Sequence, residues 1–93
     1  MLNELYEIVK DRKENPVDGS YTNLLLEKGY ERIAQKVGEE AVEVIIAAGR
    51  QGRQRLIEES ADLLYHWMVL LISQGVSLKE VEAELEKRHK GAA

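Results

Sequence analysis

The sequence has no cysteine, no phenylalanine and a single proline among its 93 residues. Without cysteine it has no disulfides, no thiolate metal ligands and no thiol nucleophile. No apolar run reaches the roughly 18 residues of a membrane-spanning helix, and the N-terminus lacks the basic and apolar regions of a secretory signal. With so little proline, most of the chain is free to be helical. These absences predict a cytoplasmic, all-α protein with no membrane partner.

The charge balance also limits the class of partner. The net charge is −4, with 44% hydrophobic and 32% charged residues, which is typical of a globular chain. A nucleic-acid-binding surface needs a concentrated basic patch, so nucleic acid is not expected as a partner. A chain of this length makes one small domain, and we expect residues 1–93 to form it.

Apolar residues at helical spacing predict four helices, or five if Gly29 breaks or kinks the second. Asn15 and Pro16 end the first helix, and Ser77 with Glu80 forms a capping box that opens the last. The expected helices span about residues 2–14, from Ser20 or Thr22 as the cap to 48, 53–73, and 78 onward. Between them we expect a turn at 17–20 and a tight connection at 49–52, and the end at 91–93 is expected to fray.

The helix expected at 53–73 is apolar nearly all round between Ala61 and Ile72. A helix of this kind must be covered on several sides, which the short helices of one chain cannot easily do. We therefore expect a helical bundle completed by dimerisation, with a homodimer as the simplest assembly.

Two of the expected helices each have a face that carries acidic residues at one level and apolar residues further along. Glu39, Glu40 and Glu43 lie on one face of the second helix, and Glu59 and Asp62 lie near the start of the third. An antiparallel hairpin about residues 49–52 would pair Glu39 with Asp62 and Glu43 with Glu59. Four carboxylates brought together repel one another unless some are protonated or a cation neutralises them.

All-oxygen ligation predicts Mg²⁺, with Mn²⁺ as the alternative, and Mg²⁺ commonly bridges to substrate phosphates. The competing interpretation is ordinary salt bridging at helical spacing, Lys36 with Glu39 or Glu40 and Arg55 with Glu58 or Glu59.

A basic strip precedes the acids, because Lys28, Arg32 and Lys36 follow one another at intervals of four residues. Phosphates could lie along this strip while a metal sits on the acids, although an ordinary solvated face has the same pattern. His66 stands one turn after Asp62 and is either a base or phosphate contact or a hydrogen-bonded cap of a buried strip.

These residues resemble a known family. Glu39-Glu40-x-x-Glu43 followed by Glu59-x-x-Asp62 is similar to the acidic signature of the all-α nucleoside triphosphate pyrophosphatases, the MazG-like superfamily. With Tyr21-Thr22, Lys36 and Tyr65-His66 added, the chain more closely resembles the phosphoribosyl-ATP pyrophosphatase family of histidine biosynthesis, over about residues 2–89.

The resemblance implies Mg²⁺-dependent hydrolysis of phosphoribosyl-ATP, a small-molecule nucleotide, to phosphoribosyl-AMP and pyrophosphate. It makes Lys36 a phosphate contact and places Tyr21 and Thr22 beside the substrate pocket. Arg32 of the basic strip and His66 are further candidates for binding the substrate. It implies that the metal ligands or their neighbours are Glu39, Glu40, Glu43, Glu59 and Asp62.

We expect a glutamate that does not ligate metal to act as the base, with Glu40 and Glu43 as candidates. Two other functions remain open on the sequence: a housecleaning pyrophosphatase of non-canonical nucleoside triphosphates, and a non-enzymatic helical dimerisation module.

Overall fold

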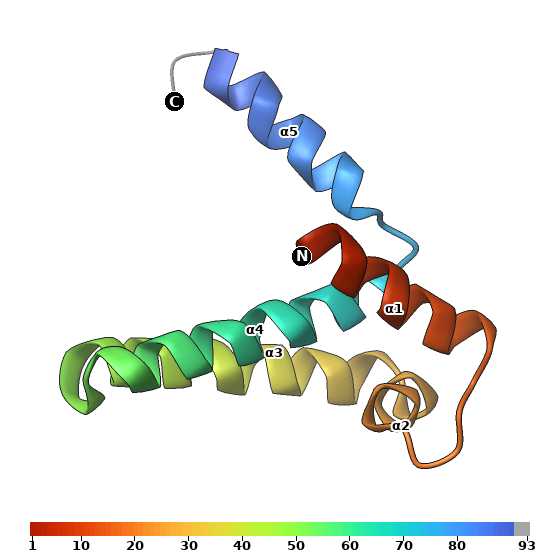
Figure 1. Cartoon of the computed structure of the whole chain (residues 1–93), viewed down its shortest axis with the longest axis horizontal. Helices are drawn as coiled ribbons and strands as arrows, with labels where there is room; N and C mark the ends of the chain where they lie inside the picture. The colour runs from red at the N-terminus through yellow and green to blue at the C-terminus, as the bar shows by residue number, and fades with distance from the viewer. Residues whose placement is uncertain (91–93) are drawn as a thin grey trace.

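The computed structural model describes residues 1–90, over which the only regular secondary structure is helical, and this confirms the all-α prediction (Figure 1). Two of its helices, α3 and α4, form a long antiparallel hairpin, with α1 and α2 packed near its open end and α5 directed away. The elements are α1 (Leu2–Glu14), α2 (Tyr21–Lys28), α3 (Tyr30–Ile46), a π-helical turn (Ala47–Gln51), α4 (Arg53–Ser73) and α5 (Leu78–Lys90).

The first helix ends where the sequence predicted, with Asn15 as its C-cap before Pro16. Ser20, rather than Thr22, caps α2, because the Asn23 N–H donates to Ser20 Oγ at 3.2 Å. The Asn23 side chain holds the intervening loop, accepting from the Val17 N–H at 2.9 Å and donating to the Arg12 carbonyl at 2.6 Å. The loop therefore sets where α2 begins relative to α1.

Of the two possibilities left open by the sequence, Gly29 breaks the long second helix rather than leaving it continuous. Its backbone lies at φ 89° and ψ −171°, a conformation that essentially only glycine adopts. It closes α2 through a hydrogen bond from its N–H to the Leu25 carbonyl and stands immediately before α3. The break turns the chain so that α2 lies across the open end of the hairpin (Figure 1).

The predicted tight connection is a π-helical turn that begins two residues earlier than expected, at Ala47. Gly52, at φ 88°, then reverses the chain and precedes α4. The predicted bounds of α4 are confirmed at both ends.

The core lies where α1, α2, α3 and α4 meet. Each of these four helices contributes at least one side chain that is nearly inaccessible to solvent. Around this cluster pack partly buried side chains, among them Leu5, Tyr6 and Tyr65. The central members are Val9, Leu25, Ile33, Val69 and Ile72.

The capping box of α5 is confirmed, because the Glu80 N–H donates to Ser77 Oγ at 3.1 Å and the Ser77 N–H donates to Glu80 Oε1 at 3.0 Å. Within the described residues α5 makes little contact with the other helices and projects from the body (Figure 1). The end predicted to fray, residues 91–93, lies outside the described part of the chain. Among residues 1–90 no helix is long and apolar enough to cross a membrane.

Candidate active site

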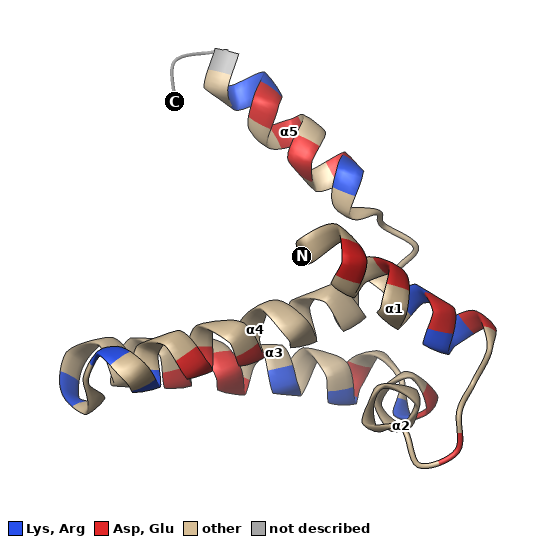
Figure 2. Ribbon diagram, in the orientation of Figure 1, with Lys and Arg blue, Asp and Glu red and all other residues tan. Residues whose placement is uncertain are grey.

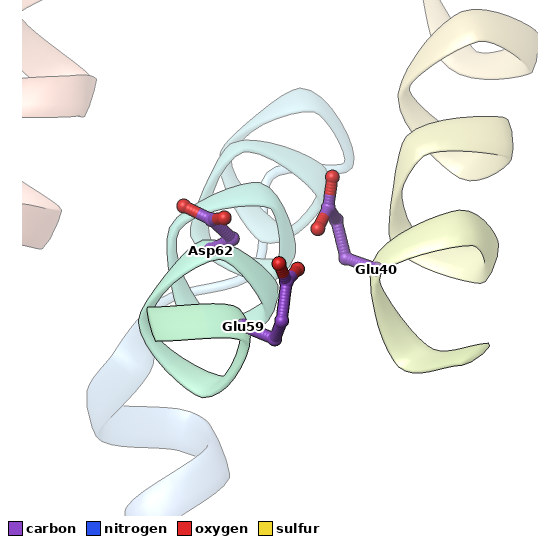
Figure 3. Close-up of side chains that lie close together, drawn as sticks. All are labelled: Glu40, Glu59 and Asp62. Carbon is purple, nitrogen blue, oxygen red and sulfur yellow. The ribbon is translucent and has the colours of Figure 1, made fainter. Parts of the chain in front are cut away.

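Three carboxylates from two helices meet midway along the hairpin. Glu40 comes from α3, and Glu59 and Asp62 come from consecutive turns of α4 (Figure 3). One oxygen of each lies within 4.8 Å of an oxygen of the other two. The red, acidic segments of the α3 and α4 ribbons lie at this level in Figure 2. The hairpin thus brings Glu59 and Asp62, two of the four carboxylates expected to converge, together with Glu40.

Two of the three acids are withdrawn from solvent. Glu40 is 9% exposed and Glu59 is 6% exposed, whereas Asp62 is exposed and leaves the group open to solvent on one side. Burial raises the pKa of Glu59, and the neighbouring charges of Asp62 and Glu40 raise it further, although Arg55 acts in the opposite sense. The site therefore disfavours the negative charge of Glu59 unless a cation stands nearby.

The ion pairs of the competing interpretation are also present. Lys36 Nζ lies 3.3 Å from Glu40 and 3.5 Å from Glu39, and Arg55 pairs with both Glu58 and Glu59. Burial lowers the pKa of Lys36, but its hydrogen bond to Glu40 and the surrounding negative charges outweigh this, so the pKa is raised overall. Lys36 is thus held as a cation at the edge of the acidic group.

The facing pair across the hairpin differs from the one expected. The sequence paired Glu39 with Asp62, but in the structure it is Glu40 that lies close to Asp62. Glu39 is an exposed residue outside this group, and it accepts a hydrogen bond from Gln35 at 3.0 Å. The ligand role predicted for Glu39 stays a prediction.

Glu43 also lies outside the close group, one turn further along α3 and half-buried. The pKa of Arg55 is raised first by its hydrogen bond to Glu58, then by the charge of Glu59, and to a smaller extent by that of Glu43. Glu43 is therefore near enough to act on Arg55, beside the carboxylate group.

The basic strip is divided between two helices. Lys28 ends α2, whereas Arg32 and Lys36 lie on α3 beyond the break at Gly29, so the regular spacing of the three does not make one helical face. Arg32 and Lys36 remain one turn apart on the same helix, with Lys36 next to the acids.

The four aromatic and hydroxyl residues singled out by the resemblance form one cluster between α2 and α4. Tyr21 Oη lies 3.0 Å from His66 Nε2, and Thr22 Oγ1 is hydrogen-bonded to Tyr65 Oη. The Tyr21 ring stacks near that of Tyr65, with centroids 6.2 Å apart. His66, 6% exposed, turns its other nitrogen to the Asp62 carbonyl at 2.7 Å. This supports the hydrogen-bonded interpretation of His66.

Two residues beside the acids and the aromatic cluster, Arg55 and Tyr65, were named from the sequence but given no role in the site. Arg55 approaches Glu59 through a spacing of four residues, which the sequence shows but which did not mark it as part of the site. Tyr65 meets Thr22 only because α2 is folded back onto α4, and no sequence spacing indicates that contact.

The donor set fits a divalent cation. Three carboxylates from a rigid hairpin supply only oxygen, the ligand type that Mg²⁺ and Mn²⁺ prefer, and the open side at Asp62 leaves room for further ligands. The pKa of Glu59 is raised chiefly by burial, and a bound cation would favour its ionised form.

Comparison with protein-family models shows the family to which the chain belongs. Residues 2–89 match the family described as phosphoribosyl-ATP pyrophosphohydrolase. The chain belongs to this family. It is 58% identical over 88 residues to a phosphoribosyl-ATP pyrophosphatase of Listeria welshimeri, an alignment that covers 95% of this chain and 84% of the relative. A phosphoribosyl-ATP pyrophosphatase of Clostridium acetobutylicum is 48% identical over 89 residues, with 96% and 81% covered.

The family also includes longer members. The histidine biosynthesis bifunctional protein HisIE of Caldanaerobacter subterraneus is 51% identical over 90 residues, which are 97% of this chain. The chain spans 44% of the length of that relative.

Proposed function

We propose that this chain hydrolyses phosphoribosyl-ATP to phosphoribosyl-AMP and pyrophosphate, the second step of histidine biosynthesis. The observation that carries the proposal is the group of Glu40, Glu59 and Asp62, gathered within 4.8 Å beside the cation of Lys36, in a chain of the phosphoribosyl-ATP pyrophosphohydrolase family. A cytoplasmic location stays the prediction that the sequence made.

Mg²⁺, or Mn²⁺ in its place, is the cofactor we propose, held by Glu40, Glu59 and Asp62. When bound, the metal supplies charge neutralisation for the pyrophosphate leaving group and orientation of the attacking water. Burial of Glu40 and Glu59 keeps two of the ligands in a low-dielectric site, where their attraction to a cation is stronger than in water.

In the reaction a water oxygen bonds to the α-phosphorus while the bond from that phosphorus to the bridging oxygen breaks. Pyrophosphate leaves with the bridging oxygen. The water proton passes to a carboxylate, for which Glu43 is better placed than Glu40, because Glu40 belongs to the close carboxylate group and is paired with Lys36.

Substrate contacts follow from the surroundings of the acids. Lys36 has a raised pKa and points its ammonium at the edge of the group, where the phosphates of a metal-bound nucleotide would lie. Arg32 stands one turn before it on α3. Tyr21, Thr22 and His66 form the adjoining wall between α2 and α4.

We also propose that the chain acts as a homodimer. Thirteen large apolar side chains are exposed among residues 1–90, whereas eight apolar residues are buried, which is an unusual balance for a monomer. The hairpin carries several of them, with Ile45 71% and Ile57 51% exposed. The amphipathic helix α5 projects from the body with Leu85 61% exposed. A second copy would cover these surfaces.

The decisive experiment is a turnover assay with Mg²⁺, in which phosphoribosyl-ATP is compared with a panel of canonical and non-canonical nucleoside triphosphates. We expect pyrophosphate release from phosphoribosyl-ATP at a far higher kcat/KM than from any other nucleotide. Preference for a non-canonical triphosphate would instead identify a housecleaning pyrophosphatase. No turnover of any nucleotide, with no effect of Mg²⁺ on thermal stability, would identify a dimerisation module.

A further inference from the structure

A chain of hydrogen bonds runs from α4 to the edge of the acidic site, and its direction is determined by its first member. His66 Nδ1 lies 2.7 Å from the Asp62 carbonyl oxygen, and that oxygen can only accept. In the neutral ring, Nδ1 therefore carries the hydrogen. His66 Nε2 is then left with a lone pair and no hydrogen.

Tyr21 completes the chain. Its hydroxyl lies 3.0 Å from His66 Nε2, which can only accept, so the Tyr21 hydrogen is donated to the histidine. The oxygen of Tyr21 keeps its lone pairs on the side away from His66. Tyr21 as a residue is 46% exposed, whereas His66 is buried, so of this pair Tyr21 is the one open to a ligand.

The Tyr21 oxygen stands next to the site from two directions. Through His66 it is linked to the backbone of Asp62, one of the three clustered acids. Tyr21 also lies near Lys36, because after the hydrogen bond to Glu40 it is the next group that raises the pKa of Lys36 against the effect of burial. A ligand held at the acids and at Lys36 would therefore pass beside Tyr21.

Because its hydrogen is donated to His66, the Tyr21 hydroxyl cannot also donate to a phosphate, whose oxygens only accept. Toward a ligand the Tyr21 oxygen can therefore only accept a hydrogen bond. The donors that a nucleotide carries closest to its phosphates are the hydroxyls of its ribose. We propose that Tyr21 is a specificity-determining residue that accepts a hydrogen bond from a ribose hydroxyl of the nucleotide, and that His66 is its positioning residue. This inference rests on the proposed function for the identity of the nucleotide.

The first test addresses the direction of the chain and needs no turnover. Long-range proton–nitrogen NMR of the full metal-free chain, at a pH where imidazole is neutral, reports which ring nitrogen of His66 carries hydrogen. The only other histidine in the sequence is His89, so a spectrum of His89→Gln shows which signals belong to His66. We expect hydrogen on Nδ1 of His66. Hydrogen on Nε2 would overturn the proposal, because Tyr21 would then be free to donate.

The second test measures binding of AMP and of 2′,3′-dideoxy-AMP by calorimetry, with Mg²⁺ present. The wild type is expected to bind AMP about three- to tenfold more tightly, as one hydrogen bond provides. Tyr21→Phe should lose this preference, while Tyr30→Phe, an exposed tyrosine on α3, should keep it. Equal preference in the wild type and in Tyr21→Phe would overturn the proposal.

The third test separates positioning from contact. His66→Gln keeps an acceptor near the place of Nε2 and should retain the preference for AMP, whereas His66→Leu should lose it. The double variant Tyr21→Phe/His66→Leu should be no worse than Tyr21→Phe alone, since both changes remove the same interaction. Additive losses would contradict the positioning role.

Turnover distinguishes this proposal from the proposed function. With phosphoribosyl-ATP, Tyr21→Phe should raise KM about three- to tenfold and leave kcat nearly unchanged. A fall in kcat at unchanged KM would place Tyr21 in the chemical step and overturn the proposal. If the wild type turns over no phosphoribosyl-ATP, the proposed function fails, while the NMR and AMP tests still decide the role of Tyr21.

Discussion

Glu40 and Glu59 come together across the α3–α4 hairpin, both almost wholly withdrawn from solvent, and each is paired with a basic residue one turn away on its own helix. Lys36 forms an ion pair with Glu40, and Arg55 forms one with Glu59. The two cations balance the two acids but leave Asp62 without a cation of its own among the ion pairs of the described residues. This residual negative charge is what a divalent ion would neutralise.

Removing one carboxylate of the group should abolish turnover without unfolding the chain. Asp62→Asn and Glu40→Gln are nearly isosteric, and we expect each to lower kcat for phosphoribosyl-ATP by about 10²–10³-fold, the usual cost of one group that stabilises transition-state charge. Circular dichroism should show unchanged helicity.

The matched control for these variants is Glu58→Gln, which changes an exposed acid next to Glu59 that lies outside the group. It should retain most of the activity. Full activity in Asp62→Asn would reject the assignment of the site.

Mg²⁺ should stabilise the folded chain, because a ligand that binds only the folded state shifts the unfolding equilibrium. At one hundred times its Kd the expected gain is about 2.7 kcal/mol. Thermal unfolding followed with and without Mg²⁺ measures it. Asp62→Asn should lose the gain, and EDTA should reverse it in the wild type. If neither Mg²⁺ nor Mn²⁺ changes the melting temperature of the wild type, the proposed metal site is wrong.

The pH dependence of stability should differ in sign between two adjacent glutamates. The pKa of Glu59 is raised, chiefly by burial, so its ionisation costs stability as pH rises through the interval above the unfolded value of 4.5. The pKa of Glu58 is lowered by its hydrogen bonds from Arg55 and Gln54, so its contribution is present above 4.5 and is lost as pH falls.

In metal-free protein at neutral pH, Glu59→Gln should therefore raise the melting temperature and Glu58→Gln should lower it. The gain in Glu59→Gln should vanish below about pH 4, where that carboxyl is protonated in both the folded and unfolded chain. Melting curves recorded over this pH range provide the test. Shifts of the same sign in both variants would show that burial does not dominate at Glu59.

Gly29→Ala should destabilise the chain by about 1–3 kcal/mol, the usual cost of forcing a side chain into so sparsely populated a backbone conformation. A Cβ there would meet no other atom within 4 Å, so the cost is one of backbone conformation alone. Gly38 is the matched control, since it lies inside α3 with equally open surroundings. Gly38→Ala should stabilise by about 0.5–1 kcal/mol. Urea unfolding measures both variants.

A charge placed at one of the exposed apolar side chains of the hairpin, Ile45 or Ile57, should dissociate the proposed dimer. Ile45→Lys and Ile57→Lys are each expected to shift the sedimenting species from two chains to one. Val17→Lys alters a similarly exposed apolar residue in the loop before α2 and should leave the assembly unchanged. A wild type that sediments as a monomer at all concentrations would contradict the homodimer.

The local elements could be predicted from the sequence because each depends on residues close together in the chain. Asn15 and Pro16 end α1, Ser77 and Glu80 cap α5, and the bounds of α4 follow from the glycines and the periodicity around it. The pairs of Lys36 with Glu40 and Arg55 with Glu59 were likewise open to prediction, since a spacing of four residues places side chains together on any helix.

Tertiary structure alone decided which residues of different helices meet. Only the packing of α3 against α4 shows that Glu40, rather than Glu39, lies close to Asp62. The positive φ of Gly29 folded α2 back and brought Tyr21 to His66. Helical periodicity determines the face on which a side chain lies, but its partner on another helix depends on the backbone angles of a few turn residues, which periodicity does not contain.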